Sequence, residues 1–154
     1  MNLDQRLEAL GIVLPPAPRP IGNYVPGVVA GGLLFMSGVG PRHPDGTSIT
    51  GKLGVDLDVE QGRAAARLVA INILANIRAV LGSLERVDRV VKTLGMVNCA
   101  PDFGLQPKVI DGFSNVFVEL FGEERGRGAR SAVGMPALPS QIAVEVEMVL
   151  QVRG

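Results

Sequence analysis

Hydrophobic positions along the chain recur with two periods, and the longer period predicts two main helices. Apolar residues return every three or four positions over residues 59–81, which is the spacing of one helix face. Asp58 precedes this stretch as a candidate N-cap, and Gly82 follows it as a candidate C-cap. The same spacing over residues 107–121 predicts a second helix that ends at Gly122.

Alternation with a period of two predicts strands around these helices. They are expected at residues 24–30, at 33–39 after a Gly31-Gly32 turn, at 87–99, in a short apolar segment that opens at Arg130, and at 142–150. The order is two strands, a helix, a strand, a helix and two strands. This order predicts an α+β domain with two helices packed on one face of a single mixed sheet. Val90, Lys92 and Leu94 are expected to share one face of their strand.

The first 20 residues are interpreted as an N-terminal helix and arm, and residues 21–154 as one domain. Residues 3–10 have helical spacing, and residues 14–20 hold four prolines, which predicts an extended segment. Residues 123–127 carry four charges and predict a polar loop.

The last predicted strand carries carboxylates on one face and apolar side chains on the other. The apolar set is Val144, Val146, Met148 and Leu150. Glu145 and Glu147 alternate with this set and point the opposite way. The other strands carry apolar residues on both faces, whereas two helices can cover only one face. The second face therefore predicts packing against another subunit, with the carboxylates near the contact.

Composition narrows the class of protein. The chain has 154 residues, of which 47% are apolar, and this is enough for one domain with a buried core. Lys and Arg number 15 and Asp and Glu also 15, and this balance argues against a nucleic-acid partner. The single Cys99 cannot form an internal disulfide, and the single His43 gives no metal-ligand spacing. The N-terminal segment has no signal-peptide pattern and no apolar run is expected to span a bilayer, so we expect a cytoplasmic protein without a membrane partner.

Arg130 and Glu145 are the candidates for chemistry on a small anionic substrate. A guanidinium recognises a carboxylate through two parallel hydrogen bonds, and a nearby glutamate can move protons. Both residues also have structural interpretations. Arg130 could pair with Glu123 or Glu124, and Glu145 could be a solvent-facing residue of an exposed strand.

Short segments in a fixed order between residues 20 and 152 carry a further signal. They are GNYVPG from Gly22, FMSG from Phe35, VVK from Val90, FVELF from Phe117, ARS from Ala129 with the later Leu138-Pro139, and VEVE from Val144. This ordered set resembles the Rid (reactive intermediate deaminase) family, also called the YjgF family. The N-terminal arm is similar to that of a longer subgroup of this family.

The resemblance implies a chorismate-mutase-like fold and a homotrimer with active sites between subunits. It also implies the hydrolysis of enamines and imines, such as 2-aminoacrylate and 2-imino acids, to 2-oxo acids and ammonia without a cofactor. An imine is already electrophilic, so positioning and proton transfer are enough to accelerate its hydrolysis.

By the family motif, Arg130 would bind the substrate carboxylate and Glu145 would position water and move protons. The resemblance implies further substrate-binding positions at Tyr24, Ser37, Gly38, Ser114 and Ala132. Ala132 stands where the best-known deaminases often have Cys, and only its backbone is expected to contact the substrate. Ser114 lies near a position where active members often have Asn, whereas Asn115 is expected to face elsewhere on the helix.

Two other functions remain as alternatives. A non-catalytic trimer could bind a small carboxylate and regulate a partner enzyme, in which case Arg130 would matter and Glu145 would not. Members of the family have also been labelled ribonucleases or translation inhibitors, but the balanced charge and the scarcity of aromatic residues give that interpretation little support. The identity of the natural imine is open at this point.

Overall fold

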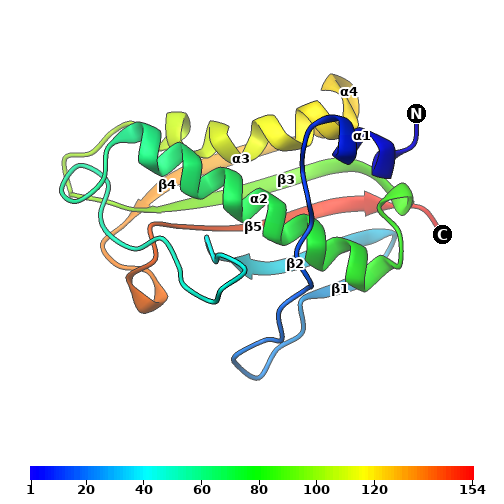
Figure 1. The fold of residues 1–154 in the computed structure, drawn as a ribbon, viewed down its shortest axis with the longest axis horizontal. Coiled ribbons are helices and arrows are strands. Elements are labelled where there is room, and N and C mark those ends of the chain that lie inside the picture. The colour runs from blue at the N-terminus through cyan, green and yellow to red at the C-terminus, as the bar shows by residue number, and fades with distance from the viewer.

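A five-stranded mixed sheet is the framework of the structure, a computed structural model that describes residues 1–154 (Figure 1). Its strands are β1 (Gly27–Ala30), β2 (Leu33–Val39), β3 (Val87–Asn98), β4 (Ala129–Met135) and β5 (Val144–Val152). Their order across the sheet is β1-β2-β5-β3-β4, and only the β3–β4 pair is parallel. The strand at the C-terminal end of the chain therefore lies in the middle of the sheet.

The helices cover one face of this sheet (Figure 1). They are α1 (Leu3–Ala9), α2 (Val59–Leu81), α3 (Gln106–Phe121) and the single turn α4 (Glu123–Gly126), with 3-10 turns η1 (Leu84–Arg86) and η2 (Pro139–Gln141). This arrangement confirms the predicted α+β fold with two main helices on one face. The predicted polar loop at residues 123–127 is wrong, because these residues form α4 and are closed by an ion pair of 2.7 Å between Arg127 and Glu123.

Local sequence signals account for the ends of α2. The Asp58 carboxylate accepts a hydrogen bond from the Gln61 backbone N–H (2.8 Å), and the Gln61 side chain accepts one from the Asp58 N–H (2.9 Å). This reciprocal pair satisfies two of the unpaired donors at the helix start. Gly82 ends the helix in the left-handed conformation, with φ of 83°, as its position predicts.

The core lies between the helices and the sheet. Val144, Val146, Met148 and Leu150 are all buried there, which confirms the predicted inward face of β5. On the helix side, the rings of Phe113 and Phe117 stack with their centroids 4.9 Å apart. The opposite face of the sheet has no helix over it (Figure 1).

Strand β3 departs from simple alternation. Val90 lies opposite Leu150 of β5, yet Lys92 lies opposite Val149, so two steps along β3 match one step along β5. Such a bulge reverses the faces of the residues that follow it. The expectation that Val90, Lys92 and Leu94 share a face is therefore wrong: Val90 is buried under the helices, and the Lys92 Nζ donates to Ser131 Oγ (2.9 Å).

The N-terminal arm joins the same core. Helix α1 forms as predicted, one residue shorter than residues 3–10, and Leu3, Leu7 and the following Ile12 belong to the main hydrophobic cluster. The Leu3 backbone N–H also donates to the Glu85 carboxylate (2.7 Å). The proline-containing segment then crosses α2 on its way to β1 (Figure 1).

Helix α2 is long and apolar enough to cross a membrane if judged only by length and composition. This corrects the expectation that no apolar run has that length. In the structure, 61% of its most apolar window is buried within the domain, so the apolar character of α2 is that of a central core helix.

Candidate functional site

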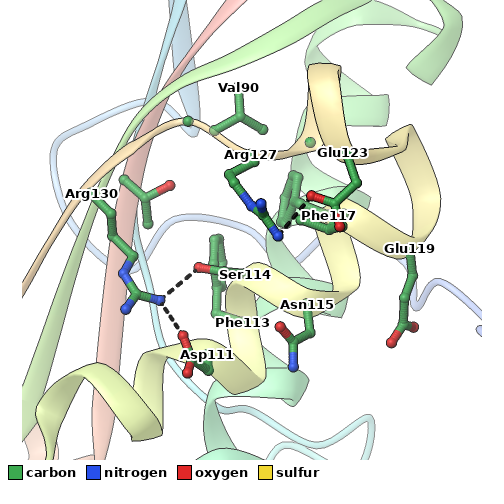
Figure 2. Close-up of a pocket in the computed structure, with 14 residues that line it drawn as sticks. Val90, Asp111, Phe113, Ser114, Asn115, Phe117, Glu119, Glu123, Arg127 and Arg130 are labelled. Atoms are coloured by element: carbon green, nitrogen blue, oxygen red, sulfur yellow. Dashed lines mark hydrogen bonds and ion pairs between the residues drawn. The ribbon is translucent and has the colours of Figure 1, made fainter.

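Arg130 lies near the start of β4, and its side chain contacts α3. Its Nη1 donates to Asp111 Oδ1 (2.8 Å) and to Ser114 Oγ (3.2 Å) (Figure 2). Its Nη2 donates to the Pro107 carbonyl oxygen (3.3 Å). The predicted structural partner, Glu123 or Glu124, is wrong because Asp111 takes this role. Three acceptors from one helix hold the guanidinium in place, and its side chain keeps 25% of its surface exposed. A fixed, partly open guanidinium is suited to an anionic ligand.

A cavity of about 470 Å³ lies beside this arginine. Ser114 and Arg130 line it, as do Asn115 and Arg127 (Figure 2). Asn115 lines a different part of this cavity, and its side chain points away from Arg130, as its position on the helix predicts (Figure 2). Asp111 was not identified from the sequence, although its spacing of three from Ser114 places both on one helix face.

Glu145 belongs to a different cavity, of about 870 Å³. The predicted residues Tyr24, Ser37 and Gly38 line this cavity with it. The Ser37 hydroxyl donates to the Val25 carbonyl oxygen (2.6 Å), and Gly38 lies so close to Glu145 that an added Cβ would be 2.8 Å from its Oε2. Half of the Tyr24 surface is exposed at the rim. The absence of a side chain at position 38 is therefore what makes room for the carboxyl group.

Burial raises the pKa of Glu145, and the negative charge of Glu147 raises it further. Both carboxylates line the same cavity, two residues apart on the uncovered face of β5. A carboxyl group with a raised pKa holds its proton closer to neutral pH than an ordinary glutamate does. That property suits proton transfer in both directions.

A tight turn just before β5 sets the position at which this strand, and with it the face that carries Glu145, begins. Ser140 and Gln141 have φ of 55° and 59°, a left-handed conformation that is rare outside glycine. The Asn98 side chain, fully buried, donates to the Ile142 carbonyl oxygen (3.2 Å), and Lys52 donates to the Asn98 Oδ1 (2.8 Å). Sequence reasoning missed this buried network, which anchors the strand that carries Glu145.

The two groups of predicted residues do not meet within one chain. Arg130 points to α3 on the helix-covered face of the edge strand β4. Glu145 lies on the uncovered face of β5, and β3 separates the two strands. Ala132 is half-buried, two residues after Arg130 on β4. No group of three or more His, Cys, Asp or Glu side chains gathers as a metal site.

These observations define a class: a chorismate-mutase-like α+β domain that carries an oriented arginine and a partly buried glutamate in two separate cavities. Comparison with known proteins agrees with this class. The family described as "YjgF/chorismate mutase-like, putative endoribonuclease" matches residues 4–150. This chain therefore belongs to the YjgF, or Rid, family.

Individual relatives cover almost the whole chain. Protein TCP17 of Trypanosoma cruzi is 45% identical over 145 residues, which are 94% of this chain and 91% of TCP17. The crystal structure of protein Atu1372 from Agrobacterium tumefaciens, of unknown function, is 41% identical, with a TM-score of 0.90 and coverage of 98% of this chain and 92% of that one. The 2-iminobutanoate/2-iminopropanoate deaminase of Escherichia coli K12 is 27% identical over 134 residues, which are 86% of this chain and 90% of the deaminase.

Proposed function

We propose that this protein is a cofactor-independent hydrolase of 2-imino acids and their enamine tautomers, which it converts to 2-oxo acids and ammonia. The observations that carry the proposal are an oriented guanidinium at Arg130 and, at a separate place on the chain, a carboxyl group of raised pKa at Glu145. A relative that covers most of the chain is a 2-iminobutanoate/2-iminopropanoate deaminase.

The complete site would form between subunits of a homotrimer. Arg130 and Glu145 lie on opposite faces of the sheet, so one small substrate can contact both only if two copies combine their half-sites. The uncovered sheet face supports this assembly, since Val28, Phe35 and Val133 leave 52%, 47% and 37% of their surfaces exposed. Exposed apolar area of this kind favours association with another protein surface.

In the proposed reaction, the Arg130 guanidinium binds the substrate carboxylate and fixes the position of the C=N bond. The substrate reacts as its protonated imine: the Glu145 carboxylate accepts a proton from a water molecule as the water oxygen adds to the imine carbon, and the C=N electron pair moves to the nitrogen, which becomes a neutral amine. The same carboxyl group then returns its proton to the nitrogen. The C–N bond breaks, ammonia leaves, and the hydroxyl of the intermediate becomes the carbonyl of the 2-oxo acid with loss of a proton.

The other residues implied by the family motif would shape the pocket. Ser114 supports the guanidinium through its hydroxyl, and the backbone of Ala132 would lie on the same strand, two residues from Arg130. Tyr24, Ser37 and Gly38 would surround the carboxyl half-site.

The test combines turnover with subunit mixing. An amino-acid oxidase generates 2-iminopropanoate, semicarbazide traps the imine that survives, and an active protein lowers the trapped signal. We expect Arg130→Ala and Glu145→Gln each to be inactive while remaining trimeric by sedimentation velocity.

Unfolding and reassembling the two variants together should restore activity. Random hybrid trimers that share each site between two chains contain about a quarter of intact sites. The Arg130→Ala/Glu145→Gln double variant, treated in the same way, should restore none. Wild-type rates in Arg130→Ala would refute the proposal, and a wild type that binds 2-oxo acids without turning over any imine would favour a carboxylate-binding regulator instead.

A further inference from the structure

Two asparagines in the middle of α2 face the cavity that contains Glu145. Asn72 and Asn76 are only 5% and 7% exposed, and they lie one helical turn apart in an otherwise apolar helix face. Both line the 870 Å³ cavity. Polar side chains at such positions are normally hydrogen-bonded, because water is excluded from around them.

The fold explains one of the two. The Asn72 side-chain amide donates to the carbonyl oxygens of Gly40 (3.2 Å) and Arg42 (2.9 Å), and these bonds hold the segment after β2 against α2. In contrast, the Asn76 Oδ1 is buried and has no hydrogen-bond partner. A leucine would fit a core position of this helix better, so a structural role does not account for Asn76.

The last residues of β2 connect the part of the cavity at Glu145 with the part at Asn72 and Asn76. Gly38 lies against the Glu145 carboxyl group, and two residues later Gly40 receives the hydrogen bond from Asn72. Along β2, the pairing with β1 ends at Met36, so the last residues of β2 pair only with β5 and β1 does not flank them. The cavity therefore runs from the carboxyl half-site, around the end of β2, to α2. Residues 18–22 of the N-terminal arm line it as well.

We infer that this branch of the cavity is a side-chain subsite that selects imino acids whose side chain ends in a carboxamide. The inference rests on the proposed function, which places the reacting carbon at Glu145. A ligand carboxamide carries both a donor and an acceptor, and it pairs with the Asn76 amide in either orientation of that side chain. An aliphatic side chain leaves Asn76 unpaired. A carboxylate only accepts hydrogen bonds, so it cannot donate to the Asn76 side-chain oxygen, and the cavity that would receive its charge is lined by both acidic (Glu145, Glu147) and basic (Arg19, Arg42) residues.

Substrates of equal shape test this selection. The imines derived from asparagine, leucine and aspartate differ only in the end group of the side chain, and those from glutamine and homoleucine extend the comparison by one methylene. We expect kcat/KM for the carboxamide to exceed that for its aliphatic isostere by about tenfold or more, because a buried polar group left unpaired penalises the wrong substrate. Equal values, or a preference for the carboxylate, overturn the inference.

Asn76→Leu is the decisive variant. We expect it to reverse the carboxamide-to-aliphatic ratio and to leave the melting temperature equal or higher, because it removes an unpartnered buried carbonyl. Arg67→Leu, which adds the same side chain at an exposed position of α2, should keep the wild-type ratio. An Asn76→Leu variant that melts lower and keeps the wild-type ratio shows a structural role and overturns the inference.

Binding of unreactive acids separates this inference from the proposed function. Succinamate, 4-methylpentanoate and succinate keep the carboxylate and the three end groups but contain no imine. Calorimetric preference for succinamate, lost in Asn76→Leu, supports the subsite even if no imine is hydrolysed, in which case only the proposed activity fails. Turnover of imines combined with equal affinity for the three acids, or with no binding of any, overturns the subsite and leaves the activity standing.

Discussion

The glycines at positions 38 and 40 give a matched pair of substitutions that separates activity from stability. Neither has a left-handed φ, so alanine is compatible with the backbone at both. A Cβ at position 38 would lie 2.8 Å from Glu145 Oε2, and one at position 40 would lie 2.8 Å from Ile142 Cδ1. The two clashes are equally short, but one falls on the proposed catalytic carboxyl group and the other on an apolar side chain.

The expected changes in rate and stability follow from which side chain must move to make room for the added Cβ. An ordinary contact begins near 3.4 Å, so the Glu145 carboxyl group must retreat by about 0.6 Å in Gly38→Ala. It has solvent on one side and can do so with a stability change within about 1 kcal/mol, yet a misplacement of this size costs roughly 10- to 100-fold in rate. Ile142 is 9% exposed, so Gly40→Ala overpacks a closed site and is expected to cost about 1–3 kcal/mol.

The assay measures kcat/KM for 2-iminopropanoate by semicarbazide competition and the free energy of unfolding by urea titration. We expect Gly38→Ala to be slow but stable, and Gly40→Ala to be less stable with a smaller loss of rate. If Gly38→Ala acts by displacing Glu145, adding it to Glu145→Gln should cause no further loss. Equal rate losses in the two alanine variants, or fully additive effects with Glu145→Gln, would refute the reasoning.

Three further predictions concern charge, assembly and the fold. Glu147→Gln should lower the pKa of Glu145, because it removes the negative charge that is the smaller of the two causes raising that pKa. Since the ionised form of Glu145 is the proposed base, the acidic limb of the pH–rate profile should move to lower pH. An unmoved limb would contradict an electrostatic effect of Glu147 on Glu145. Phe35→Glu should convert the proposed trimer to smaller species in sedimentation velocity, because it places a charge on the uncovered apolar face. Ala64→Glu, on the exposed side of α2, should leave the assembly unchanged. Asp58→Ala should lower the free energy of unfolding by about 1 kcal/mol, because it removes the capping box of α2. The value of kcat/KM should stay unchanged, and a change in it would contradict a purely structural role of this cap.

Local patterns predicted most of the elements correctly. The capping box at Asp58, the left-handed Gly82 and the alternation along β5 are each decided by neighbouring residues, so they can be read without knowledge of the tertiary structure. The order of the motif segments indicated the family, and with it the residues at positions 130 and 145.

The predictions were wrong where contacts between residues distant in the sequence determine the structure. The bulge in β3 depends on its pairing with β5, and it reversed the faces expected for Val90 and Lys92. The partner of Arg130 proved to be Asp111, since parallel pairing of β4 with β3 sets the edge strand under α3 rather than beside the charged turn at residue 123.

The sequence by itself determined the fold class, the inward and outward faces of β5 and the identity of the two candidate charged groups. These properties follow from periodicity and from residue type, which are local. Only the tertiary structure decided that Arg130 and Glu145 lie on opposite faces of the sheet, and that Asn76, whose side-chain oxygen is buried without a partner, lines the cavity that contains Glu145. Strand order and the path of β2 past α2 create these relations, and no short stretch of the chain encodes them alone.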